Sequence, residues 1–261
     1  MLHQNYWQDS AARKEQARQW LSYIEQNYQP YVDNSIEYTK IYKEDHIFNN
    51  KEQGTIPDIR MIVSDTVSVV LDIWNKYSPK KPCVLNFASY TNPGGKFLEG
   101  SKAQEECLCH ESTLYPVQSA FMTSYYMENA HNKNNAMYLN RALYSPNIIF
   151  IRDGLRPVAC DVLTCAAPNY TTASKYGRIT KTDNTQILKS RCRYLLNVME
   201  ENGVDTPILG AYGCGVFGQD AAEVATIFKM LLRSGRYHFK TVIFAVIEGP
   251  NAAEFQRILN T

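Results

Sequence analysis

Residues 86–115 constrain the fold of this chain more than any other part of the sequence. The apolar residues 83–87 lead into this stretch and read as a buried strand. The chain then reaches an Asn-Pro-Gly-Gly sequence at residues 92–95, where a tight loop is expected, and continues as a helix that begins with Gln-Glu-Glu at residues 104–106. A strand, a glycine loop and paired carboxylates in this order are typical of a site that holds an anionic ligand beside an acid/base group.

Strands and helices are predicted to alternate from residue 59 to the end of the chain. Short apolar runs predict strands at residues 59–63, 83–87, 147–151, 161–166, 208–212 and 241–247. Amphipathic or capped segments predict helices at residues 66–77, 104–114 (closed by Pro116), 183–202, 220–234 and 251–259, with one or two short helical pieces within residues 117–147. This alternation is typical of an α/β sheet with helices on both faces.

The N-terminal region is predicted to be a helical extension. Residues 10–29 place Ala17, Trp20, Leu21 and Ile24 on one helical face, and Pro30 is expected to end that helix. Residues 32–55 are mostly polar without a clear period, which indicates an irregular connection. We therefore predict that residues 1–58 pack as an extension on a single domain formed by residues 59–261.

Several predicted strands end at residues suited to ligand binding. Glycine, proline or asparagine follows the strands at residues 92–95, 168–169, 213–218 and 248–249. Ligands of open α/β sheets bind beyond the carboxyl ends of the strands, so these segments are expected to share one cleft.

The stretch at residues 86–115 resembles the signature of bacterial-type poly(ADP-ribose) glycohydrolases, a branch of the macrodomain fold. That signature has three glycines, a short spacer and Gln-Glu-Glu. Gly94 and Gly95 match the first two glycines, Lys96 stands in the third place, and seven residues separate it from Gln104. The resemblance covers about residues 59–248 and implies a three-layer, macrodomain-like mixed sheet that binds ADP-ribose.

A second glycine motif lies between a predicted strand and a predicted helix. Its members are Gly213, Cys214, Gly215, Val216, Phe217 and Gly218. Glycines let backbone amides approach phosphate oxygens, and the following helix adds the positive end of its dipole, so the motif predicts a cradle for a diphosphate. The resemblance implies the same role and implies that Phe217 packs against the terminal ribose. A tight turn without a ligand, with Phe217 in the core, is the alternative interpretation.

The second motif also fits the G-x-G-x-x-G pattern of nicotinamide dehydrogenases. That fingerprint requires an acidic residue about 20 residues further on, at the end of the next strand. Here Glu248 follows Gly218 by 30 residues, and the motif lies late in the chain rather than at the start of a domain. Both features argue against a dehydrogenase.

Glu105 and Glu106 are the candidate catalytic residues. Cleavage of a glycosidic bond needs a group that protonates the leaving oxygen and activates water, and a glutamate with a raised pKa can do both. Neighbours on a helix lie about 100° apart, so the two side chains must differ in role. The resemblance implies that Glu106 is the acid/base, that Glu105 orients a ribose hydroxyl, and that Gln104 holds the loop or the ribose. An acidic cluster that merely stabilises the helix N-terminus is the alternative.

Four further residues are candidate ligand contacts. Lys96 either contacts a phosphate or is a solvated loop residue, and it costs little in place of glycine if its φ is negative. Asn92 is suited to a ribose hydroxyl or to the turn itself, and Asn86 was weighed for the same hydroxyls. Asp65 is expected to cap the helix at residue 66, and the resemblance also implies a hydrogen bond to the adenine amino group.

Composition excludes several classes of protein. A formal net charge of +1 argues against general nucleic-acid binding, and the longest apolar run, residues 242–247, is far shorter than the roughly 20 residues of a membrane span. Residues 1–16 carry no apolar signal core, and seven cysteines without paired spacing fit a reducing cytoplasm. A zinc site formed by Cys107, Cys109 and His110 would need a second half, for which Cys160 and Cys165 are the nearest candidates.

Together these features predict a cytoplasmic, monomeric glycohydrolase. The resemblance implies that it cleaves ribose–ribose bonds of poly(ADP-ribose), or related ADP-ribosyl linkages, without a metal or a redox cofactor. Its partners would be ADP-ribose polymer or ADP-ribosylated protein. The alternative is an ADP-ribose-binding macrodomain with weak or no catalysis, because Lys96 replaces the third glycine.

Overall fold

The computed structural model describes residues 9–49, 53–177 and 179–260. Within them the strands form one mixed sheet in the order β1-β4-β5-β3-β6-β7-β2. The strands are β1 Lys40–Tyr42, β2 Asp58–Val63, β3 Pro82–Phe87, β4 Ala142–Phe150, β5 Val158–Cys165, β6 Thr206–Leu209 and β7 Thr241–Val246. Strands β5, β3, β6, β7 and β2 run parallel, whereas β4 is antiparallel to both β5 and β1.

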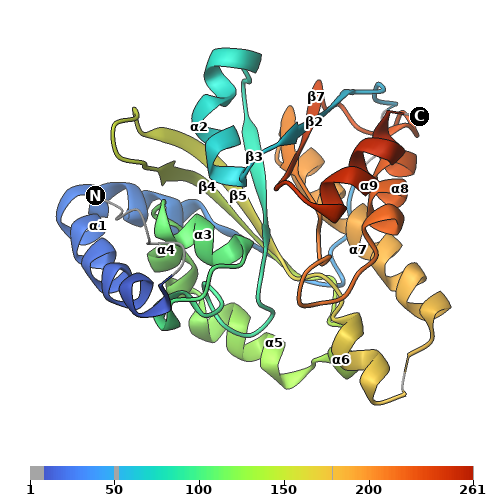
Figure 1. The fold of residues 1–261 in the computed structure, drawn as a ribbon, viewed down its shortest axis with the longest axis horizontal. Helices are drawn as coiled ribbons and strands as arrows, with labels where there is room; N and C mark the ends of the chain where they lie inside the picture. Colours follow the sequence, from blue (N-terminus) through green and yellow to red (C-terminus); the bar gives the residue numbers. More distant parts are fainter. Residues whose placement is uncertain (1–8, 50–52, 178, 261) are drawn as a thin grey trace.

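Helices cover both faces of this sheet, as Figure 1 shows. The helices are α1 Ser10–Tyr38, α2 Thr66–Tyr77, α3 Gln104–His110, α4 Leu114–Ala120, α5 Glu128–His131, α6 Tyr170–Lys175, α7 Lys181–Glu201, α8 Ala221–Leu232 and α9 Pro250–Leu259. Three short helical turns are η1 Phe97–Glu99, η2 Met122–Met127 and η3 Asn134–Ala136. The prediction of a three-layer α/β sheet with an N-terminal helix is confirmed.

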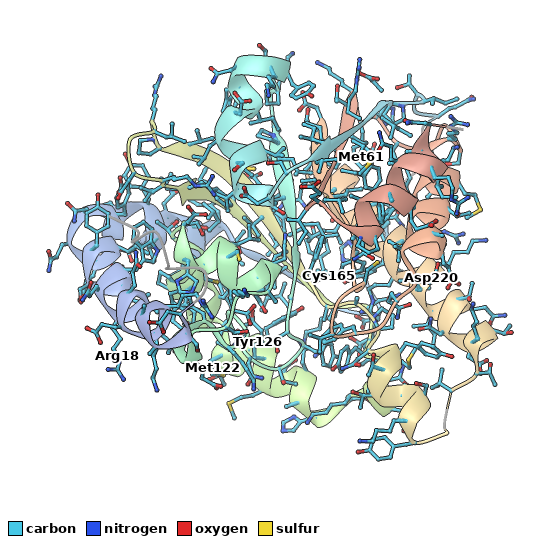
Figure 2. The ribbon with its side chains drawn as sticks, viewed as in Figure 1. Arg18, Met61, Met122, Tyr126, Cys165 and Asp220 are labelled. Atoms are coloured by element: carbon cyan, nitrogen blue, oxygen red, sulfur yellow. The ribbon has the colours of Figure 1, made fainter. Side chains whose placement is uncertain are left out.

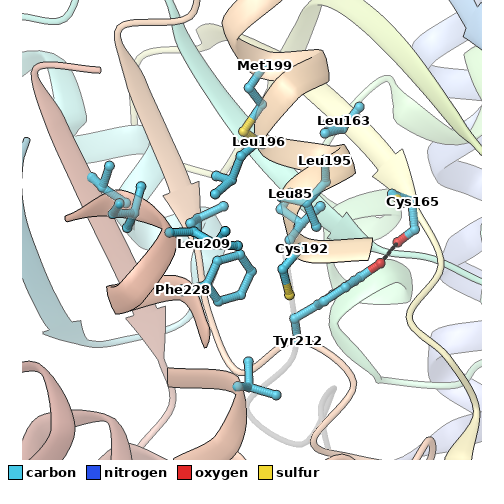
Figure 3. Packing of buried hydrophobic residues seen from close by; sticks show 14 of the residues in the cluster. Leu85, Leu163, Cys165, Cys192, Leu195, Leu196, Met199, Leu209, Tyr212 and Phe228 are labelled. Carbon is cyan, nitrogen blue, oxygen red and sulfur yellow. Dashed lines mark hydrogen bonds between the residues drawn. The ribbon is translucent and has the colours of Figure 1, made fainter. Parts of the chain in front are cut away.

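Successive side chains of the central strands point to opposite faces of the sheet, so the core has two halves, one on each face. Leu85 of β3 and Leu163 of β5 face a cluster that includes α7, α8 and α9, with Leu195 and Phe228 among its members (Figure 3). The neighbouring residues, such as Val84, face a second cluster formed with α1 to α4. Because both faces of the central strands are buried, their sequences are mostly apolar.

The side chains follow this layered arrangement. Arg18 points outward from α1 into solvent, whereas Tyr126 lies inside the molecule (Figure 2). No helix in the described part of the chain is both long enough and apolar enough to cross a membrane. Two predicted segments lie partly outside the described residues. They are residues 1–8, from the stretch predicted to lack a signal core, and residues 50–52, from the predicted irregular connection.

Pro30 does not end the first helix, which was a wrong prediction. Helix α1 continues through it to Tyr38, and strand β1 follows within the segment that was expected to be irregular. A proline inside a helix costs about 3 kcal/mol. Here Pro30 itself is exposed, but Val32 and Ser35 beyond it are buried. We attribute the continuation of the helix to this tertiary packing.

The helix predicted for residues 104–114 breaks after His110. Ser112 forms a bridge with Phe150, and the amide of Thr113 donates to the carbonyl of Ile149 at 3.0 Å. A new helix, α4, then begins at Leu114. Pro116 therefore lies in the first turn of α4 and does not close the region. In the first turn a backbone N–H has no partner within the helix, so the missing N–H of proline is tolerated.

Candidate active site

The two glycine loops meet at one cavity of about 650 Å³. They are more than a hundred residues apart in sequence, and each follows a strand of the parallel part of the sheet. The cavity is lined by eleven of the predicted site residues, namely Asp65, Asn92, Gly95, Lys96, Gln104, Glu105, Glu106, Gly213, Gly215, Val216 and Phe217. Of the four segments predicted to share one cleft, residues 92–95 and 213–218 contribute to the lining, whereas residues 168–169 and 248–249 do not and only their neighbours Ala167 and Ile247 line the cavity.

Three predicted ligand contacts do not line the cavity. Gly94 has a φ of +63°, and a Cβ atom built on it would lie 2.5 Å from Cδ2 of Tyr115. Gly218, with a φ of +70°, would clash in the same way with the hydroxyl of Thr171. Cys214 packs against the core, where its thiol donates to the carbonyl of Tyr212. These residues shape the two loops from behind, and their assignment as ligand contacts stays a prediction.

Glu105 is buried, and both of its carboxyl oxygens accept hydrogen bonds from protein donors. Its Oε2 accepts a hydrogen bond of 2.7 Å from the amide of Ser89, and its Oε1 accepts from Asn86 Nδ2 at 3.0 Å and Gln118 Nε2 at 3.1 Å. Burial raises the pKa of Glu105 to about 8, against the opposing effect of these three bonds. The carboxyl group is therefore fixed in orientation. Asn86, weighed above as a ribose contact, is itself fully buried beneath it.

Glu106 has one engaged oxygen and one open oxygen. Its Oε1 accepts a hydrogen bond of 2.9 Å from the backbone amide of Lys96. No group among the described residues bonds to Oε2, although that atom is buried. A buried carboxylate oxygen without a partner is costly unless a ligand supplies one. Glu106 lines the cavity, so this oxygen is placed to meet a bound molecule.

Gly95 makes room for both carboxylates. Its φ is +57°, and a Cβ atom there would lie 2.5 Å from Glu106 Oε1 and 3.0 Å from Glu105 Oε2. Lys96 follows with a φ of −112°, which side chains adopt without strain. Its ammonium is exposed and lies 3.7 Å from Glu99. Lysine in the third glycine position therefore leaves the path of the loop intact.

Gln104 fixes the start of α3 to the end of β3. Its Oε1 accepts from the amide of Phe87 at 2.8 Å, and its Nε2 donates to the carbonyl of Leu85 at 3.0 Å. The side chain thus occupies the place of a neighbouring strand where the pairing of β3 with β6 has ended at Val84. Of the two roles considered for Gln104, the hydrogen bonds favour holding the loop.

Asp65 is the N-cap of α2, as predicted. Its Oδ1 accepts from the amide of Ser68 at 2.9 Å and from Arg152 at 3.1 Å. Burial alone would raise the pKa of Asp65, but hydrogen bonds from Ser68 and the charge of Arg152 hold that pKa below its usual value. Asp65 is therefore an acceptor that faces the cavity.

Aromatic side chains form the wall beside the second glycine loop. Phe217 meets Tyr138 edge to face, with 6.0 Å between ring centroids, and Tyr138 stacks on Tyr90 at 4.3 Å. Both tyrosines line the cavity. Sequence reasoning missed them because 18 tyrosines gave no basis for choosing. Ser89 and Gln118, which hold Glu105, were also missed, and no local motif marks them.

The cysteines considered for zinc are dispersed through the core. Cys109 is buried, and its thiol lies 3.8 Å from Oε1 of Gln118. Cys160 and Cys165 belong to clusters on opposite faces of the sheet. In the part of the chain that the structure describes, no three His, Cys, Asp or Glu side chains are grouped to hold a metal ion.

A mixed three-layer sheet whose two glycine loops flank an acidic pair defines a macrodomain-like hydrolase. The family model described as "Microbial-type PARG, catalytic domain" matches residues 13–153, more than half of the chain. The chain therefore belongs to the microbial-type poly(ADP-ribose) glycohydrolase family. A comparison with curated protein sequences found no match.

Solved structures of this family are similar over most of the chain. The poly(ADP-ribose) glycohydrolase of Thermomonospora curvata has 27% identity and a TM-score of 0.85, covering 95% of this chain and 99% of that chain. Its complex with the inhibitor ADP-HPD has 28% identity and a TM-score of 0.83, with the same coverage. The enzyme of Deinococcus radiodurans in complex with ADP-ribose has 27% identity and a TM-score of 0.77, covering 88% of this chain and 97% of that chain.

Proposed function

We propose that this enzyme hydrolyses the O-glycosidic ribose–ribose bonds of poly(ADP-ribose). Membership of the family and the similarity to structures that bind ADP-ribose or ADP-HPD support this activity. The observation that carries the proposal for this chain is the open Oε2 of Glu106 inside a cavity bounded by both glycine loops.

In the proposed mechanism Glu106 is the general acid/base. In its protonated form it gives a proton to the leaving ribose oxygen as the anomeric C–O bond breaks. The anomeric carbon acquires oxocarbenium character, and water adds to it while Glu106 takes a proton from that water. One O–H bond of water is thus consumed for each glycosidic bond broken, and Glu106 returns to its initial state.

The surrounding residues would hold the substrate for this step. The backbone at Gly213 and Gly215 would bind the diphosphate, with Phe217 against the terminal ribose. Glu105 would accept a hydrogen bond from a ribose hydroxyl, and Asn92 would contact the same sugar. Asp65 would accept a hydrogen bond from the adenine amino group. The resemblance to the family implies the roles of Glu105, Phe217 and Asp65, and all of these residues lie in the cavity lining.

The alternative of an inactive ADP-ribose reader is not favoured. It rested on Lys96 in place of glycine. The negative φ of Lys96 and the hydrogen bond from its amide to Glu106 leave the acidic pair correctly supported.

We further propose a monomeric, cytoplasmic enzyme that acts on polymer or on ADP-ribosylated protein and does not bind nucleic acids generally. The near-neutral net charge supports the last point. We also propose that residues 1–58 serve as an extension of the catalytic domain at residues 59–261. The described part of this region packs on the core, where Arg13 donates to the carbonyl of Gly100 at 2.7 Å.

The test compares wild type with Glu106→Gln on purified poly(ADP-ribose). Wild type should release free ADP-ribose, and the variant should lose at least about 10²-fold in kcat, since a positioned acid/base contributes this much or more. ADP-ribose binding, measured by calorimetry, should persist in the variant. Full activity in Glu106→Gln would refute the assigned role, and no release by wild type would refute the activity itself.

A further inference from the structure

Gln118 is a buried polar side chain outside the glycine loops and the Gln-Glu-Glu motif. It lies on α4 with no exposed surface. Its Nε2 donates to Glu105 Oε1 at 3.1 Å and to Thr164 Oγ1 at 3.2 Å, and its Oε1 is 3.8 Å from the thiol of Cys109. Both ends of the amide are therefore engaged, which defines a single orientation of the side chain.

The break between α3 and α4 is what brings Gln118 to Glu105. In a continuous helix their separation of thirteen positions would span about 20 Å along the axis. Instead, the chain turns at Thr113, which exchanges two hydrogen bonds with Ile149 of β4. One of them is accepted by the Thr113 hydroxyl. The second helix then returns alongside the start of the first. The interruption of the helix is thus coupled to the support of a carboxylate in the active site.

Gln118 acts together with Asn86 on the same oxygen. Both amides donate to Glu105 Oε1 and also reach Thr164 Oγ1, while Ser89 holds Oε2. All three contacts with Glu105 are N–H donors, an arrangement that satisfies a carboxylate rather than a carboxylic acid, which would need an acceptor.

Among the described residues, the ionisable groups that interact with Glu105 include two on its own helix and one on η2, and none of these three is a cation. Glu106 and Cys109 lie on its own helix, and Tyr126 approaches from η2. Neutral donors such as Gln118 therefore supply the support that a cation gives in other sites.

We propose that Gln118 is a positioning residue for catalysis: it holds Glu105 in one orientation beside Glu106, and so supports the proposed contact of Glu105 with the ribose. This inference rests on the proposed function. Gln118 is absent from the cavity lining and would act through Glu105.

The kinetic test uses Gln118→Met, which keeps the volume and removes the donor, and Gln118→Glu. For Gln118→Met, kcat on poly(ADP-ribose) should fall by at least about tenfold while KM changes by less than about threefold, because misplacement of a catalytic group affects the chemical step. Gln118→Glu can donate the same hydrogen bond only while protonated. Its activity should therefore be lost as pH rises, at a lower pH than in wild type.

Asn202→Leu is the matched control. Asn202 is a buried amide at the end of α7 that bonds Tyr42, Lys40 and the carbonyl of Val198. Its replacement removes a comparable set of hydrogen bonds without touching the cavity. It should lower the unfolding temperature but leave kcat and the pH profile unchanged. Wild-type kinetics in Gln118→Met, or the same kinetic loss in Asn202→Leu, would overturn the proposal.

A second measurement is independent of activity. The loss of stability caused by Gln118→Met, measured by urea unfolding, should grow as pH rises toward 9, because the buried carboxylate has lost a donor. In a Glu105→Gln background, Gln118→Met should lower the free energy of unfolding by the same amount at every pH. A pH-independent cost in both backgrounds would refute the role of Gln118 even if wild type proved inactive, whereas inactivity of wild type alone bears only on the proposed function.

Discussion

The backbone amide of Lys96 donates a hydrogen bond of 2.9 Å to Oε1 of Glu106, while the Lys96 ammonium lies out in solvent near Glu99. The support of Glu106 therefore comes from the loop backbone. At this position the path of the loop matters more than the identity of the side chain.

Replacement of the Lys96 side chain should therefore have little effect on catalysis. Lys96→Ala is expected to lower kcat/KM on poly(ADP-ribose) by less than about threefold. Lys96→Gly should behave in the same way but lose roughly 0.5–1 kcal/mol of stability, because glycine gains freedom in the unfolded chain. Steady-state kinetics and urea unfolding check both expectations. A hundredfold loss in Lys96→Ala would show instead that the ammonium contacts the substrate.

Gly95→Ala should inactivate the enzyme more than it destabilises the fold. The new Cβ atom would lie 2.5 Å from Glu106 Oε1, so the carboxylate must move. A displaced acid/base is expected to cost about 10²-fold in kcat. Gly235→Ala is the matched control, because Gly235 has a similar φ of +68° and open space around it. Backbone strain should lower the stability of both variants by a similar amount, about 1–2 kcal/mol. Only Gly95→Ala should lose activity. Equal kinetics in the two variants would contradict this account.

The residues that sequence analysis identified share a local signature. The glycines of both loops, the Gln-Glu-Glu motif and the cap at Asp65 are each recognisable from a few neighbouring residues, and the structure brings most of them to one cavity. Their convergence followed from the rule that parallel strands present their carboxyl ends at the same edge. The fold class could be predicted for the same reason, since each strand and helix has its own periodic pattern.

The features that could not be predicted depend on distant partners. The break after His110 is fixed by a hydrogen bond from Thr113 to Ile149, a residue distant in sequence. Pro116 was read as a sign that a helix had ended, but a proline can also lie in the first turn of a helix, as it does in α4. Helix α1 passes Pro30 where Val32 beyond it is buried. Gln118 reaches Glu105 only because of the break in the helix, and no spacing rule for a continuous helix pairs residues thirteen apart.

The stability of the protein should fall as pH rises from about 4.5 to about 8. The pKa of Glu105 is raised from 4.5 to about 8 in the folded protein, so the folded state retains a proton that the unfolded state has released. In this window the contribution of Glu105 decreases by about 1.4 kcal/mol per pH unit, and it levels off above the folded pKa. Glu105→Gln should flatten this part of a curve of unfolding free energy against pH. An unchanged slope in the variant would mean that Glu105 ionises normally in the fold.

Phe217→Ala should weaken the hold on the terminal ribose. Phe217 lines the cavity and packs edge to face on Tyr138, so its removal takes away the wall beside the reacting sugar and leaves Tyr138 less supported. We expect kcat to fall by about tenfold or more, since positioning of the reacting group is lost, and ADP-ribose to bind more weakly by roughly 1–2 kcal/mol. Leu155→Ala is the control, because Leu155 is a half-exposed apolar residue in a surface turn away from the cavity lining. Calorimetric titration with ADP-ribose and single-turnover hydrolysis separate the two effects. Normal single-turnover rates in Phe217→Ala, with only weaker binding, would assign Phe217 to ligand affinity and remove it from the positioning of the sugar.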